Sequence, residues 1–254
     1  MAKILFLTQI VPFPPDAGPK VKTYHVIRAL AGQGHSVTLV SFVRPEEVRH
    51  IPALQEICEA VHIVPIRRSR IADVGYMIKS YLTNRPFLIE RDDLRPMQET
   101  VNRLVKEDNF QFIHADQLTM VQFALRGASA FPDKKPKVIF DAHNAVWTIV
   151  ERMKDNARFF LKPVLAVEAR RVKQYEGELL RTVDHVLAVT DIDRNLLEEA
   201  LHFSKPNRDG RVSSITVVPI AVDTEKLQPV RRRAGSKNIV TLGTLHYPPN
   251  ADGI

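Results

Sequence analysis

The chain has 254 residues and carries 36 lysines and arginines against 29 aspartates and glutamates, a formal net charge of +7. Its hydrophobic fraction of 44% is too high for a disordered chain, and the lone Cys58 excludes a disulfide framework. No apolar run approaches the roughly 20 residues needed to cross a bilayer, and the N-terminus lacks a signal-peptide core. We therefore expect a cytoplasmic globular protein. Its charge indicates an anionic partner (phosphate-bearing substrate, acidic lipid or nucleic acid) or simply a solvated basic surface.

Strand and helix patterns alternate from the N-terminus. Residues 3–11 form a continuous aliphatic run, typical of a strand covered on both faces. The proline-rich loop 12–19 leads into a predicted helix that ends at Gly34, and residues 35–42 have the pattern of the next strand. Strand, helix and strand within about forty residues predict a βαβ unit with parallel strands.

The same alternation continues to about residue 225. The further helices are expected at 46–60, 71–82, 92–107, 118–125, 163–181 and 192–200. The further strands are expected at 61–65, 110–114, 137–141, 186–189 and 215–218. The pattern predicts an α/β fold with a doubly wound, Rossmann-like parallel sheet.

The C-terminal residues have a different composition. We expect residues 1–230 to form one domain and the arginine-rich segment 231–236 to be a polar linker. Residues 237–254 predict one strand and a loop, which are too few residues to bury a core. The expectation is that a second domain begins here and is truncated.

The loops that follow the strands are the candidate sites, because ligands bind at the carboxyl ends of open parallel sheets. In the first such loop, Gly18 allows close backbone approach, and the helix that follows presents its positive end to an anion. Lys20 and Lys22 add charge there. A proline-rich turn without any ligand explains the same residues equally well.

Histidines and aspartates follow two later strands. His114 and Asp116 end one strand, and Asp141, His143 and Asn144 end the next. An imidazole at a cleft edge can act as a general base that a carboxylate orients. Two histidines and two aspartates are also plausible metal ligands for a hydrolase. A third interpretation is structural, with the histidines hydrogen-bonded to backbone, and spacing alone leaves all three open.

A fourth loop carries Thr190 and Asp191, either of which can cap the helix that follows. Capping does not exclude a hydroxyl that faces a ligand. Signatures of serine hydrolases, zinc proteases and kinases are absent from the sequence. The basic clusters lack interleaved aromatic residues, so no nucleic-acid partner is expected. A peripheral membrane contact through residues 71–81 or the helix near Arg170 remains an alternative.

The chain resembles, segment by segment and in order, the N-terminal half of retaining GT-B glycosyltransferases of the family-four type. Within that family it is most similar to the sugar transferases of polysaccharide export systems. The resembling segments are 4–8, 12–25, 34–40, 141–144, 184–190, 217–223, 227–229 and 243–250.

The resemblance implies transfer of a sugar from a nucleotide sugar to a glycan or lipid-linked acceptor, with retention and without a cofactor or essential metal. It implies action in the cytoplasm or at the inner membrane face. Ala17 and Gly18 match the glycine loop near the donor phosphates, although a second glycine is common at Ala17. His143 matches the strand-end histidine beside the transferred sugar and is the expected catalytic residue. The expected donor or acceptor contacts are Ala17, Gly18, Lys20, Asp116, Asn144 and Thr190. Lys20 is included for its charge at the helix start and does not come from the resemblance.

The resemblance also implies that the N-terminal lobe binds the acceptor and that a C-terminal lobe holds the donor. Because the expected donor lobe would follow residue 254, we expect this chain to be inactive alone. Two alternatives stay open. One is a metal-dependent hydrolase that uses His114, Asp116, Asp141 and His143, and the other is a non-catalytic flavodoxin-like binding domain.

Overall fold

The computed structural model describes residues 1–206, 210–221, 229–231 and 233–238. Within them, a seven-stranded sheet has the order β3-β2-β1-β4-β5-β6-β7, and every neighbouring pair is parallel. Its strands are β1 (Lys3–Thr8), β2 (Ser36–Val43), β3 (Ala60–Pro65), β4 (Phe112–Asp116), β5 (Lys137–Ala142), β6 (His185–Ala188) and β7 (Ser214–Val217). The predicted doubly wound α/β fold is therefore confirmed.

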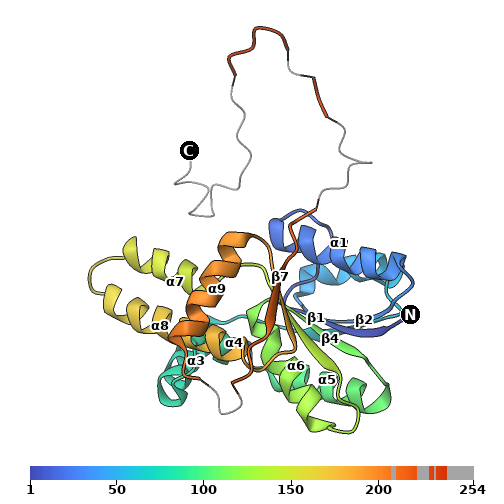
Figure 1. Cartoon of the computed structure of the whole chain (residues 1–254), viewed down its shortest axis with the longest axis horizontal. Helices are drawn as coiled ribbons and strands as arrows, with labels where there is room; N and C mark the ends of the chain where they lie inside the picture. Colours follow the sequence, from blue (N-terminus) through green and yellow to red (C-terminus); the bar gives the residue numbers. More distant parts are fainter. Residues whose placement is uncertain (207–209, 222–228, 232, 239–254) are drawn as a thin grey trace. The chain divides into compact units, whose positions relative to one another are not determined.

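Helices connect the strands (Figure 1). They are α1 (Gly18–Gly32), the 3₁₀ helix η1 (Pro45–His50), α2 (Ile51–Gln55), α3 (Arg70–Thr83), α4 (Phe87–Asp92), α5 (Arg95–Glu107), α6 (Leu118–Ala130), α7 (Val146–Asp155), α8 (Lys162–Leu179) and α9 (Asp191–Phe203). Figure 1 shows α1 on one side of the sheet and α5 and α6 on the other.

The central strand β1 is buried on both faces, as its aliphatic run predicts. On one face Phe6 packs in a cluster with Ile27 of α1 and Leu54 of α2. On the other face Leu5 and Leu7 belong to a larger cluster that includes buried side chains of α5, α6, α8 and α9. The two cores fix the sheet between two helical layers, which leaves the carboxyl ends of the strands as the edge that can carry a site.

Some elements differ from the sequence-based expectation. The helix expected over 46–60 is a 3₁₀ turn followed by a short helix that ends at Gln55. Helices α4 and α7 were not expected at all. Strand β4 begins and ends two residues later than the predicted range 110–114, and Asp116 is its last residue.

Helices α8 and α9 approach one another at a glycine. A Cβ atom added to Gly177 would lie 2.1 Å from the backbone oxygen of Ala200 and 2.7 Å from Cβ of Ser204. No side chain fits at that distance, so Gly177 sets how closely the two helices pack.

The compact unit of the chain is Met1–Ala221. Beyond it, the backbone N–H of Ser236 donates to the carbonyl oxygen of Arg233 at 3.2 Å. The strand and loop expected over 237–254 lie almost entirely outside the described residues. The same holds for residues 222–223, for residues 227–228 and for the whole segment 243–250. The expected boundaries at 230 and 236 stay predictions. None of the helices within the described ranges is long and apolar enough to span a membrane.

Candidate functional site

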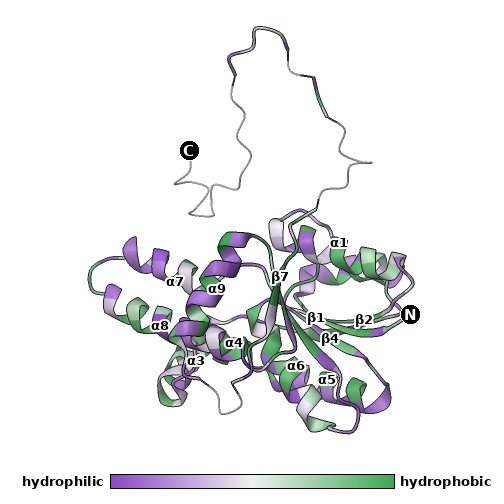
Figure 2. Cartoon of the chain, in the orientation of Figure 1, coloured by the Kyte–Doolittle hydropathy of each residue, from purple (hydrophilic) through white to green (hydrophobic). Residues whose placement is uncertain are grey.

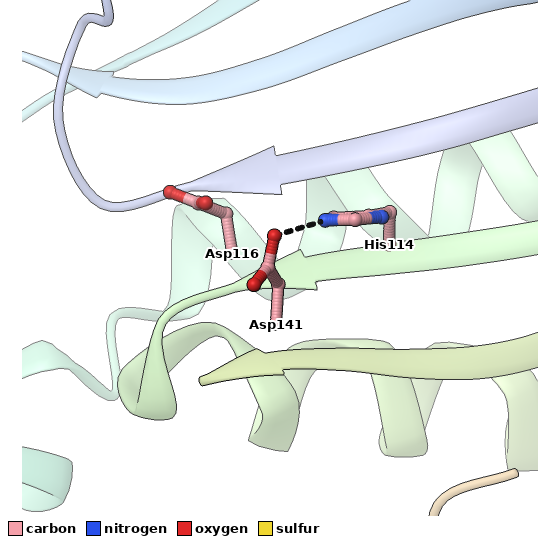
Figure 3. A group of neighbouring side chains, drawn as sticks. All are labelled: His114, Asp116 and Asp141. Carbon is pink, nitrogen blue, oxygen red and sulfur yellow. Dashed lines mark hydrogen bonds and ion pairs between the residues drawn. The ribbon is translucent and has the colours of Figure 1, made fainter. Parts of the chain in front are cut away.

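The carboxyl ends of β4 and β5 bring together the polar side chains that the sequence singled out. Asp116 and Asp141 are register partners on the two strands, and His114 lies two residues before Asp116. All three are buried, and their potential ligand atoms lie within 4.8 Å of one another. Figure 3 shows the His114 ring and the Asp141 carboxylate directed toward each other.

His143 forms a hydrogen-bonded pair with Asp116. Its Nε2 atom lies 2.8 Å from Oδ1 of Asp116, and 9% of the His143 side chain is exposed. The other carboxylate oxygen accepts from the hydroxyls of Thr23 at 2.9 Å and Thr8 at 3.1 Å. A carboxylate oxygen accepts hydrogen bonds, so Nε2 of His143 is the donor in this pair and Nδ1 is not engaged by Asp116. Asp116 thus fixes the orientation of the His143 ring.

The second pair, His114 with Asp141, is more deeply buried, and a lysine neutralises its carboxylate. Nε2 of His114 lies 3.2 Å from Oδ2 of Asp141, and the His114 ring stacks on Phe6 with centroids 4.2 Å apart. The Lys22 ammonium donates to the other oxygen of Asp141. Burial alone would raise the pKa of Asp141, but the His114 hydrogen bond and the Lys22 charge together hold that pKa well below its usual range.

These contacts correct one interpretation and weigh against another. The structural reading placed both histidines on backbone groups, whereas each is paired with a carboxylate. For the metal reading, His114, Asp116 and Asp141 do form a compact donor set. A divalent ion there would have to displace the Lys22 ammonium from Asp141 and the three hydrogen bonds from Asp116. The two aspartates already have a lysine and two histidines as partners, so the arrangement fits a network of paired side chains better than a metal centre.

Helix α1 begins beside this network. Ala17 is its N-cap, and its methyl side chain accepts no capping hydrogen bond. Val21 is the first residue whose N–H reaches a helical acceptor, the oxygen of Ala17 at 2.9 Å. The N–H groups of Gly18 and Lys20 precede that bond and have no intrahelical acceptor. A Cβ on Gly18 would meet no atom within 4 Å. The helix start therefore faces open space.

The two lysines of α1 have different environments. Lys20, the lysine that the sequence analysis selected, is partly buried and pairs with the exposed Asp16 at 3.2 Å. Lys22 is buried and reaches Asp141 across the sheet. Thr23, the next residue, holds Asp116. Through Lys22 and Thr23 the first turns of α1 are joined to both histidine–aspartate pairs, so Gly18 and His143 lie at the same edge of the sheet.

Asn144 and Thr190 lie at the neighbouring strand ends. Asn144 follows His143 and is exposed. Thr190 follows β6, whose Ala188 is paired with Ala142 of β5. The predicted cap is confirmed at Thr190, because its Oγ1 accepts from the backbone N–H of Asp193 at 3.0 Å. Contact of either residue with a substrate stays a prediction, as do the substrate contacts of Ala17, Gly18, Lys20 and Asp116.

The loop after His143 is held from α8 by a residue that the sequence analysis missed. Both oxygens of Glu176 accept backbone N–H groups at the start of α7, from Val146 at 2.8 Å and from Trp147 at 2.9 Å. Burial raises the pKa of Glu176 to about 8, against the lowering effect of those two bonds. Thr8 and Thr23 were missed as well. Only their positions, at a strand end and on the inner side of a helix, could have indicated them.

The fold and the site together define a Rossmann-like lobe. In it, the start of a helix, where an anion is favoured, lies beside a histidine that a carboxylate holds in place. Residues 18–226 match the family described as Glycosyltransferase Family 4. The chain belongs to this family.

Solved structures with a similar fold include UGT89C1 of Arabidopsis thaliana complexed with UDP, at 15% identity and a TM-score of 0.45. That match covers 87% of this chain and 50% of that one. UDP-GlcNAc 2-epimerase of Methanocaldococcus jannaschii matches at 14% identity and a TM-score of 0.39, over 85% of this chain and 44% of that one. The chain thus spans about half the length of these structures. A comparison with curated proteins gives no match.

Proposed function

We propose that this chain is the acceptor-side lobe of a retaining glycosyltransferase that moves a sugar from a nucleotide sugar to a glycan or lipid-linked acceptor. Family membership supports the reaction class. The observation that carries the proposal is the His143–Asp116 pair at 2.8 Å, at the edge where α1 begins.

Each part of this edge has a role in the proposed reaction. The start of α1, with the N–H groups of Gly18 and Lys20 not used within the helix, faces the diphosphate of the donor. His143 presents its Nδ1 side to a hydroxyl of the transferred sugar, while Asp116 keeps the ring in place. Asn144 and Thr190 border the same edge. Lys22 and Asp141 are internal and stabilise the strand ends rather than touching substrate.

The donor requires a second surface. In the proposed reaction, negative charge develops on the leaving diphosphate and needs preorganised positive groups from a second lobe. We therefore propose that residues 1–254 do not catalyse sugar transfer by themselves. We also propose that the reaction uses no essential metal. The proposed place of action is the cytoplasm or the inner face of a membrane.

The test is a transfer assay on a chain that carries both lobes. A panel of UDP-, GDP- and ADP-linked sugars is supplied with glycan and lipid-linked acceptors, and the anomeric configuration of the product is read by NMR. Product with the donor's configuration supports the proposal. Inversion, or stoichiometric tightly bound zinc together with hydrolysis in place of transfer, would overturn it in favour of another mechanism or of the hydrolase alternative.

A further inference from the structure

Helix α3 directs its apolar side to solvent. Of its 14 residues only Ser80 is buried, and the Ser80 hydroxyl donates to the carbonyl oxygen of Arg85 at 2.6 Å. Apolar side chains three or four positions apart share the opposite side and are 51–86% exposed: Ile71, Val74, Ile78, Tyr81 and Leu82. A helix of a globular domain normally buries such a stripe. Here each of these side chains stays more than half exposed, although the Arg171 guanidinium lies over the Tyr81 ring.

The turn between α7 and α8 exposes a second apolar group. Phe159 is 84% exposed and Phe160 55%, and their rings meet edge to face with centroids 5.6 Å apart. Figure 2 shows this turn as a hydrophobic stretch at the end of the two helices. Arg158 and Lys162 flank the two rings and are also exposed. Aromatic side chains beside cations are typical of segments that lie at the headgroup level of a bilayer.

Helix α8 joins the two apolar groups. Val164 and Val167, in its first turns, are 42% and 44% exposed. Further along α8, the Arg171 guanidinium lies over the Tyr81 ring of α3 at 4.7 Å and donates to Asn84 at 3.0 Å. We define the docking surface as the apolar stripe of α3, the exposed valines of α8 and the Phe159–Phe160 turn.

The charges around the docking surface are mostly positive and unpaired. Four exposed cations beside it form no ion pair within the described residues: Arg67, Arg70, Arg158 and Lys162. The nearby acidic side chains have hydrogen-bond or ion-pair partners of their own, or line a hollow with other arginines. Glu168 accepts the backbone N–H of Phe87 at 2.6 Å, and Lys154 pairs with Glu151 and Asp155. Asp73 lines a hollow with Arg68 and Arg91.

We propose that this surface docks the protein onto a bilayer that contains anionic phospholipid. Phe159 and Phe160 enter the interface, and α3 lies along it with its apolar stripe toward the acyl chains. The cations then face lipid phosphates. A symmetric dimer through the same surface would instead bring two surfaces with the same unpaired positive charges together, which is unfavourable. The proposal does not depend on sugar transfer and is tested without any donor.

The experiment measures binding to vesicles. Phosphatidylcholine vesicles with and without roughly 30% phosphatidylglycerol are mixed with the chain and sedimented. We expect binding to the anionic vesicles and at least tenfold weaker binding to phosphatidylcholine alone. Binding to the anionic vesicles should weaken as salt rises, because at about 0.15 M salt charges more than about 8 Å apart are already largely screened.

Paired variants locate the contact. Phe159→Ser with Phe160→Ser, and separately Ile71→Asn with Ile78→Asn, should each weaken binding by about tenfold or more. Arg158→Gln with Lys162→Gln should weaken binding to anionic vesicles alone. All six side chains are exposed, so melting temperatures should stay close to that of the starting protein.

Matched controls lie elsewhere on the molecule. Val212→Asn removes an apolar side chain that is 51% exposed outside the docking surface. Arg95→Gln with Arg103→Gln removes two exposed cations from α5. Both controls should bind like the starting protein. In addition, Phe159→Trp adds a second indole to the single native tryptophan, and its emission should shift to the blue with anionic vesicles.

Three results would overturn the proposal. The first is no binding of the starting protein to anionic vesicles. The second is equal binding by the paired variants, or equal loss in the controls. The third is a dimer in sedimentation equilibrium that the Phe159→Ser, Phe160→Ser pair dissociates, because a second copy would then occupy the surface.

Discussion

Nε2 of His143 lies 2.8 Å from Oδ1 of Asp116, and that carboxylate is fully buried. Its other oxygen is held by Thr8 of β1 and Thr23 of α1. One carboxylate therefore joins two strands, the first helix and the loop that carries the histidine. The orientation of the His143 ring is set by packing that extends across half of the sheet.

Replacing Asp116 should impair transfer through His143. In Asp116→Asn, the amide can donate to Nε2 and thereby favour the other tautomer, so kcat of the two-lobed enzyme should fall by roughly a hundredfold or more, with little change in KM for the donor. Asp133→Asn, at an exposed acid, is the control. Unchanged kcat in Asp116→Asn would show that Asp116 does not position His143.

Replacing Lys22 should destabilise the fold. Lys22→Met leaves the buried Asp141 carboxylate without its ammonium, which costs on the order of 3–5 kcal/mol in the free energy of unfolding. Lys20→Met removes a partly exposed pair two residues away and should cost no more than about 1 kcal/mol. Urea denaturation measures both. Equal effects of the two substitutions would mean that the Lys22–Asp141 pair does not form.

Glu176 should make stability depend on pH. Its pKa is raised from an ordinary 4.5 to about 8 in the folded protein, so the folded state keeps a proton that the unfolded chain has lost. Its contribution is therefore complete below about pH 4.5 and is lost as pH rises through about 8. The melting temperature should fall over this range, and more steeply than in Glu176→Gln. Parallel curves for the two proteins would contradict the raised pKa.

Gly177 should not tolerate a side chain. In Gly177→Ala, the Cβ would meet the Ala200 carbonyl oxygen at 2.1 Å, and separating α8 from α9 should cost about 1–3 kcal/mol or more. Gly75 is the matched control, since a Cβ there meets nothing within 4 Å. Gly75→Ala in the interior of α3 should be neutral or stabilise by about 0.5–1 kcal/mol. Thermal melts of the two variants that coincide would refute the close approach of α8 and α9.

Much of the fold could be predicted because its signals are local. The aliphatic run of β1 and the helical spacing of α1 each appear within a short window. Helix α7 could not be predicted, because its β-branched start is stabilised by Glu176 from α8, 30 residues away. Helix α4 has only six residues, too few for a helical period to show. Its Glu90 and Asp92 are buried where arginines and a lysine pair with them.

The candidate site was predictable in its residue types but not in its pairings. Strand ends placed His114, Asp116, Asp141 and His143 at one edge, and the structure brings all four there. Which histidine pairs with which aspartate depends on the register of β4 with β5, and no local pattern encodes that register. Whether Lys20 or Lys22 reaches Asp141 depends on the rotation of α1 about its axis relative to the sheet. That rotation likewise comes from tertiary packing.

The central claim is that His143, beside the start of α1, faces the transferred sugar. The most direct measurement is kcat of His143→Ala in the two-lobed enzyme, at saturating nucleotide sugar and with the dissociation constant of the nucleotide measured separately. We predict a fall in kcat of about a hundredfold or more, with nucleotide affinity and melting temperature close to those of the unsubstituted enzyme. Transfer at the unsubstituted rate would contradict it.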